Sequence, residues 1–295
     1  MGDFIDRLKF KYKTGDVMIK LIFINTIIFL VIKSLGVVFT LFNLQQIDFL
    51  QYLAVPSSLT ELLKRIWTPI TYMFIHKGFW HLLFNMLWLY WFGSIFMQYF
   101  SGRTLGSLYI LGGLSGAILY IITFNLIPYY IGIGDSWMIG SSAAVMAIVF
   151  GIAFYRPDIR INLFLFGNIK IIYIAIFVFL LDFLALSDAS NPGGHIAHIG
   201  GAIAGYIFAS RYKKGKDITE WMSSLVDSII NLFKPKKKKA KMKVSYKKKE
   251  SDTDYNYRKH NEQEEIDAIL DKLKQSGYSS LSAKEKETLF NASKK

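Results

Sequence analysis

The sequence of 295 residues contains no cysteine. This absence excludes disulfide bonds and thiolate metal sites, and it leaves the redox compartment open. A cleavable signal peptide is not predicted either, because the first sixteen residues are polar and basic and the first apolar run is too long. The chain also lacks the polar balance of a soluble domain, since 52% of its residues are hydrophobic and its mean hydropathy is +0.30. The composition therefore predicts an all-α membrane protein.

Six apolar runs are predicted to be transmembrane helices. Their residues are 17–42, 80–99, 105–127, 137–155, 169–186 and 195–212. Several runs are shorter than the ~20 residues that span hydrocarbon comfortably, which suits a protein that thins the bilayer around it. The long connection 43–78 is rich in aromatic residues, which predicts a partly folded segment at the membrane interface.

The distribution of Lys and Arg predicts the topology. Basic residues follow the second, fourth and sixth runs, whereas the loops 127–136 and 187–194 contain none. The positive-inside rule then places both termini in the cytoplasm. The net charge of +13 comes largely from the C-terminal tail. Beside transmembrane helices, such a basic tail indicates topology or contact with anionic lipid, and not nucleic-acid binding.

Four segments are predicted along the chain. They are a cytoplasmic N-terminal segment (1–16), a six-span domain (17–212), an amphipathic helix with a lysine-rich linker (213–260) and a C-terminal helical hairpin (261–295). In the third segment, Asp217 and Glu220 have the spacing of a capping box for a helix ending at Phe233, and lysines dominate 234–249. In the hairpin, Gly277 ends the first helix, and a capping box at 282–285 begins the second.

Polar residues interrupt the three runs that begin on the outer side. His81, Ser142 and His198 each lie a few residues inside their run. At 1.5 Å per helical residue, a residue four to six positions inside lies roughly 6–9 Å below the outer end. These three side chains are therefore expected at similar depths near the outer face. Polar groups are costly in lipid unless they are used, so the arrangement favours a hydrolase site.

Each of these residues has an assignable role in peptide hydrolysis. Ser142 is a nucleophile once a base accepts its proton, and His198 is the natural base because imidazole titrates near neutral pH. The amide of Asn85 and the ring of His81, one helical turn earlier, can donate to the developing oxyanion. Small residues recur every four positions on two runs and predict close helix contact; they are Ala143, Ala147 and Gly151 on the fourth and Gly201 and Gly205 on the sixth.

Taken singly, the same residues have ordinary structural explanations. A serine in a membrane helix usually hydrogen-bonds to its own backbone, and a lone intramembrane histidine is often structural. His76 and His195 are interpreted in that structural way. The combination is more specific than any member. It comprises His81-Leu82-Leu83-Phe84-Asn85, then Gly140-Ser141-Ser142, then Ala197-His198-Ile199-Gly200-Gly201 followed by Gly205.

This combination closely resembles the rhomboid family of intramembrane serine proteases over about residues 17–212. The resemblance implies a six-helix bundle in a prokaryotic cytoplasmic membrane that cleaves membrane-anchored proteins near the outer face. It implies a Ser142–His198 dyad without an acid, oxyanion donors Asn85 and His81, and no metal or organic cofactor. A lateral opening beside the fifth span and a movable cap at 187–194 follow from it as well. Structural support is implied for His76, Gly140, Gly201 and Gly205.

Three positions depart from the family pattern. Ala143 replaces the usual glycine after the nucleophile, Met146 replaces an aromatic residue, and Lys64 stands where a tryptophan is common. Asp182 invites a triad with His198, but a role at the interface or lining the gate is favoured. Two alternatives stay open: an inactive relative that binds membrane proteins, and a small transporter, whose polar site would lie nearer the bilayer centre.

Overall fold

The computed structural model describes residues 15–44, 48–163, 167–187, 191–233 and 251–293. The chain divides into two compact units, Met1–Lys234 and Pro235–Lys295. The predicted lysine-rich linker, most of the N-terminal segment and part of the expected cap lie outside the described residues.

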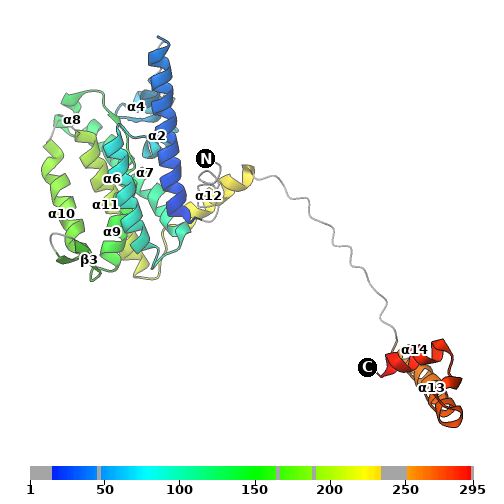
Figure 1. Cartoon of the computed structure of the whole chain (residues 1–295). Coiled ribbons are helices and arrows are strands. Elements are labelled where there is room, and N and C mark those ends of the chain that lie inside the picture. Colours follow the sequence, from blue (N-terminus) through cyan, green and yellow to red (C-terminus); the bar gives the residue numbers. More distant parts are fainter. Residues whose placement is uncertain (1–14, 45–47, 164–166, 188–190, 234–250, 294–295) are drawn as a thin grey trace. The chain divides into compact units, whose positions relative to one another are not determined.

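Helices occupy all six predicted runs of the first unit, side by side in Figure 1. By length and apolar character, only the first and third of these qualify as membrane spans among the described helices. The six helices are α2 (Val17–Leu41), α6 (Phe79–Phe96), α7 (Gly102–Leu126), α9 (Ser142–Tyr155), α10 (Ile171–Leu184) and α11 (Pro192–Tyr212).

Helix α9 is the centre of the bundle. Every residue from Ala143 to Ala153 is buried, and the helix packs mainly against α11 and α7. Small side chains on these helices allow the close approach that the sequence predicts. Helix α10 differs, because only Ile171, Ala175 and Asp182 of its fourteen residues are buried. It is therefore a peripheral helix with few packing constraints.

The connection between α2 and α6 is partly folded, as predicted. Arg65 in this connection lies over the ring of Trp137, with 5.1 Å between the guanidinium carbon and the ring centroid. An aromatic partner for this arginine is thus supplied from a distant segment. The elements of the connection are α3 (Phe49–Leu53), β1 (Val55–Pro56), α4 (Leu59–Lys64), α5 (Thr68–Thr71) and the 3₁₀ helix η1 (Tyr72–Phe74).

The prediction that the fourth helix starts at Trp137 is wrong. Residues Trp137–Met138 form strand β2, which pairs antiparallel with β1, and α8 (Pro128–Ile133) precedes it. The helix α9 begins only at Ser142, because Gly140 has φ +126°, outside the helical region. The depth estimate from helical rise therefore fails for Ser142, because residues 137–141 before it are not helical. His81 and His198 lie within their helices.

The remaining elements of the first unit join and follow the bundle. Strands β3 (Arg160–Leu163) and β4 (Gly167–Lys170) form an antiparallel hairpin before α10, and η2 (Ala185–Ser187) follows it. The amphipathic helix α12 runs from Glu220 to Phe233. Its predicted start at Asp217 is wrong, because the Asp217 carboxylate accepts the backbone N–H of Thr219 in a local turn at 2.7 Å.

The second unit is a pair of helices, α13 (Asp252–Ser276) and α14 (Ala283–Ala292), joined by η3 (Tyr278–Ser280). The first helix begins nine residues earlier than the predicted hairpin. The capping box at Ser282 and Glu285 is present with both reciprocal hydrogen bonds. Gly277 follows the last residue of α13 and has φ +73°, so it ends the helix as predicted.

Candidate active site

Ser142 is the first residue of α9, and the backbone that leads to it is fixed by Gly140. The Gly140 N–H donates to the carbonyl of Tyr72 at 3.0 Å. A Cβ added at Gly140 would lie 2.9 Å from Nε2 of His81 and 3.6 Å from Oγ of Ser142. The glycine therefore provides the space in which the His81 ring lies beside the Ser142 hydroxyl.

Helices α9 and α11 meet along the small residues that the sequence predicts. A Cβ on Gly201 would clash with the carbonyl of Ala143, and one on Gly205 would clash with the carbonyl of Ala147. The residue after Ser142 thus touches the residue three positions after His198. The Ser142 hydroxyl and the His198 ring are not hydrogen-bonded to each other within the described part of the chain. Such bonds are often long without substrate and tighten when it binds.

The extra methyl group of Ala143 has a specific place in the bundle. It points at Gly116 of α7, where an added Cβ would lie 2.6 Å from it. Gly116 therefore accommodates the departure from glycine at position 143. Met146 is buried one turn later in α9.

Asn85 and His81 lie one turn apart on α6, as predicted. The Asn85 amide nitrogen donates to the carbonyl of His81 at 2.7 Å, and the side chain is buried. An amide nitrogen carries two hydrogens, so this bond leaves one for a substrate oxygen. The oxyanion role of both residues stays a prediction.

His76 is a buried neighbour of this group. Its Nε2 lies 3.1 Å from Oγ of Ser141, and its ring meets the His81 ring edge-on with 5.1 Å between centroids. The sequence suggested a structural role for His76 without naming this partner. Ser141, interpreted as a small packing residue, is fully buried and joins the loop before α6 to the start of α9.

Asp182 on α10, expected at the interface or lining the gate, has partners that the sequence did not predict. The residue is 7% exposed, and Oδ1 lies 2.8 Å from Nδ1 of both His195 and His198. The signal was present in the sequence, because two histidines three apart share one helix face. The ligand atoms of these three side chains lie within 4.8 Å of one another. Two imidazoles and a carboxylate are a donor set that zinc accepts.

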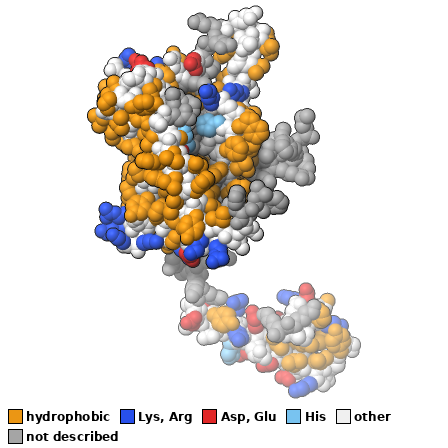
Figure 2. All heavy atoms as spheres, turned by 90° about the vertical axis from the view of Figure 1, so that its left-hand side faces the viewer, with side chains coloured by type: hydrophobic (Ala, Val, Ile, Leu, Met, Phe, Trp, Pro, Cys, Tyr) orange, Lys and Arg blue, Asp and Glu red, His pale blue; other side chains and the backbone are white. Residues whose placement is uncertain are grey.

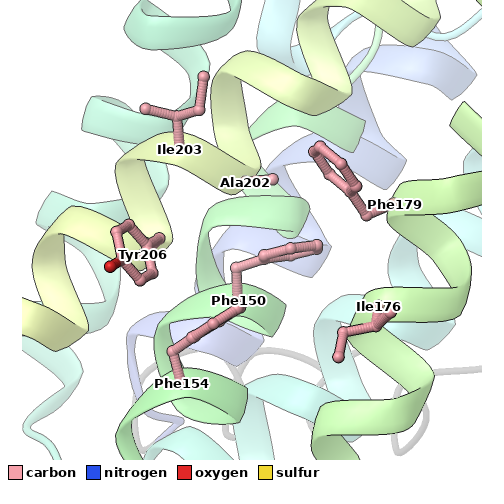
Figure 3. Close-up of a pocket in the computed structure, with 7 residues that line it drawn as sticks. All are labelled: Phe150, Phe154, Ile176, Phe179, Ala202, Ile203 and Tyr206. Atoms are coloured by element: carbon pink, nitrogen blue, oxygen red, sulfur yellow. The ribbon is translucent and has the colours of Figure 1, made fainter. Parts of the chain in front are cut away.

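A separate apolar pocket lies between α9, α10 and α11. Phe150 lies eight residues after Ser142, about 12 Å further along the helix. The pocket is therefore distinct from the cluster of polar side chains around Ser142. Figure 3 shows the rings of Phe150 and Phe179 turned toward one another across this space. Its volume is about 270 Å³, and its lining residues are Phe150, Phe154, Ile176, Phe179, Ala202, Ile203 and Tyr206.

The surface of the bundle has the character expected at a bilayer. Figure 2 shows a broad hydrophobic band on the face that carries α10, with Lys and Arg beyond it at both ends. Histidine side chains reach the surface near one end of this band. Histidine side chains are therefore accessible from outside the bundle, beside an apolar surface.

Comparison with known proteins identifies similar sequences for both units. A family profile described as the Rhomboid domain matches residues 63–214, and a family of unknown function (DUF6576) matches residues 249–295. Two relatives come from Arabidopsis thaliana. "RHOMBOID-like protein 12, mitochondrial" is 29% identical over 161 residues, which cover 52% of this chain and 48% of the relative. "RHOMBOID-like protein 7" is 25% identical over 144 residues, which cover 49% and 42%. The matched region is thus less than half of each relative.

Proposed function

The chain belongs to the rhomboid family, and from this premise we propose that it is an intramembrane serine endopeptidase. The observation that carries the proposal is the contact between Ala143 and Gly201, which brings the start of α9 against the His198 segment of α11. Ser142 acts as the nucleophile and His198 as its general base. Both side chains are only partly buried, so a substrate can reach them.

The start of α9 at Ser142 supplies donors for the oxyanion. The first N–H groups of a helix have no acceptor within the helix and carry partial positive charge. The backbone N–H of Ser142 can therefore join the Asn85 amide and the His81 ring around a substrate carbonyl oxygen.

The reaction proceeds in two halves. Oγ of Ser142 attacks the scissile carbonyl while His198 takes its proton, and His198 then protonates the leaving amine. Water, activated by His198, hydrolyses the acyl-enzyme and regenerates Ser142. The chain's own residues supply every group that these steps require.

The proposed substrates are membrane-anchored proteins cut near the outer face of a prokaryotic cytoplasmic membrane. The six helices span the bilayer, and both termini are cytoplasmic, as the positive-inside rule indicates. The sparse burial of α10 supports a lateral opening beside it. A substrate helix unwinds locally there, because a helical backbone shields its carbonyl groups.

Helix α12 is proposed to lie on the cytoplasmic membrane surface. Trp221, Leu225 and Ile229 recur every four residues and are exposed, whereas Met222 is buried. An exposed apolar row next to a lysine-rich segment suits an interface that contains anionic lipid.

A fluorophosphonate probe on the purified, detergent-solubilised full chain tests the function. We expect covalent labelling of the wild type, loss of labelling in Ser142→Ala, and retained labelling in the control Ser228→Ala, which changes an exposed serine of α12. The same three proteins are assayed with a reporter transmembrane substrate. A folded wild type that neither labels nor cleaves would identify an inactive binding protein or a transporter. Cleavage by Ser142→Ala would overturn the mechanism.

A further inference from the structure

We infer that Asp182 is a positioning residue for His198, so that the site works as a Ser142–His198–Asp182 triad. This inference rests on the proposed function. It adds a carboxylate to an arrangement that the family resemblance describes as a dyad, and it assigns a role to a buried charge on α10.

The hydrogen bonds of Asp182 define the state of the His198 ring. An ionised carboxylate only accepts, so the hydrogen lies on Nδ1 of His198, which donates to Oδ1 at 2.8 Å. The other ring nitrogen, Nε2, then has a free lone pair and can accept the proton of Ser142. When it does, the carboxylate stabilises the positive imidazolium, as the aspartate does in other serine proteases.

Burial makes an accidental contact implausible on energetic grounds. A buried carboxylate is costly unless donors satisfy it, and Asp182 is 7% exposed. The other buried residues of α10 are the apolar Ile171 and Ala175. The position of Asp182 is therefore explained by the donors it meets on α11 and not by apolar packing.

His195 completes the arrangement from the same face of α11. Its Nδ1 also donates to Oδ1 of Asp182 at 2.8 Å. One carboxylate oxygen has two lone pairs, so the two histidines saturate it and fix its direction. His195 thus orients the Asp182 carboxylate, and the carboxylate in turn orients the His198 ring.

Steady-state kinetics of the full chain on a reporter transmembrane substrate test this role. We expect Asp182→Asn and Asp182→Leu to lower kcat at least about 100-fold with little change in KM, because the equivalent change elsewhere costs ~10⁴-fold. The leucine variant removes the acceptor without leaving an unpaired polar group, so it remains informative if the asparagine variant is unstable. The comparison variant His195→Asn removes one donor to Asp182 but keeps the Asp182–His198 bond, so it should lower kcat less than the Asp182 variants do.

Three results would overturn the inference. The first is wild-type kcat in a folded Asp182 variant. The second is an equal loss of kcat and of thermal stability in the Asp182 and His195 variants. That result would show that Asp182 serves only to hold α10 against α11. The third is loss of wild-type activity on chelation with recovery on adding Zn²⁺, which would assign the three side chains to a metal. Cleavage that survives Ser142→Ala would instead refute the proposed function itself.

Discussion

The carbonyl of Ala143 lies against Gly201, and no side chain other than hydrogen fits between them. This contact fixes the distance between α9 and α11 at the level of the proposed nucleophile and base. Because the obstacle is backbone, it cannot move aside as the end of a flexible side chain would.

Gly201→Ala is expected to destabilise the bundle and abolish cleavage. Overpacking a tight core costs about 1–3 kcal/mol, and here it also separates Ser142 from His198. Thermal unfolding in detergent and reporter cleavage measure the two effects. The matched control is Gly36→Ala in helix α2, where an added Cβ meets nothing within 4 Å. Equal behaviour of the two variants would show that the α9–α11 contact is not needed.

Gly140→Ala is expected to lose activity through a local clash. The position has φ +126°, and an added Cβ would lie 2.9 Å from the His81 ring. Backbone strain of this kind costs of order 1–3 kcal/mol. Gly134→Ala is the control, since Gly134 also has positive φ but an added Cβ there has open space. If both variants lose the same activity, strain alone explains the loss and His81 is not involved.

Much of the fold follows from local sequence, and the exceptions arise from contacts between distant segments. The apolar runs predicted the bounds of α6, α7 and α11 to within a few residues. This was possible because the length of an apolar run can be read from the local sequence. The start of α9 was missed because β2 pairs with β1, about eighty residues earlier, and no local pattern encodes that pairing. The turn at Asp217 was missed because its side chain satisfies Thr219 instead of the helix N-terminus.

The candidate site divides in the same way. Ser142 and His198 were named as candidates from the sequence because polar residues are conspicuous in apolar runs. The contacts of Asp182 were not predicted, because they depend on how α10 approaches α11. The bond between His76 and Ser141 joins segments 65 residues apart and has no sequence signature.

Asn85→Ala is expected to lower kcat by about 10²–10³ with KM nearly unchanged, because an oxyanion donor acts mainly in the transition state. Reporter kinetics and the rate of fluorophosphonate labelling measure this effect. The control is Thr26→Ala, because the Thr26 hydroxyl in α2 donates to the carbonyl four residues earlier, at 2.8 Å, as the Asn85 amide does. A similar loss in both variants would mean that the helix bond, and not an oxyanion contact, accounts for the effect.

The C-terminal unit is expected to lose stability in acid through Glu285. The Lys272 ammonium, 2.9 Å away, and then the backbone N–H and hydroxyl of Ser282 lower the pKa of the Glu285 carboxyl from 4.5 to about 2. The carboxylate is thus favoured in the folded state, so its contribution is complete above the unfolded pKa near 4.5. It is lost as the pH falls from there toward 2.

Circular dichroism of a fragment covering residues 249–295 measures this dependence as the thermal midpoint at pH 6 to 2. Glu285→Gln should lower the midpoint at pH 6, since the ion pair with Lys272 is gone, and should flatten its fall below pH 4.5. Glu265→Gln, on the exposed surface of α13, is the control for a general loss of negative charge. Other carboxylates contribute equally to the wild type and to Glu285→Gln, so the difference between their two curves isolates Glu285. Parallel curves for these two proteins would show that the capping box and its lysine do not stabilise this unit.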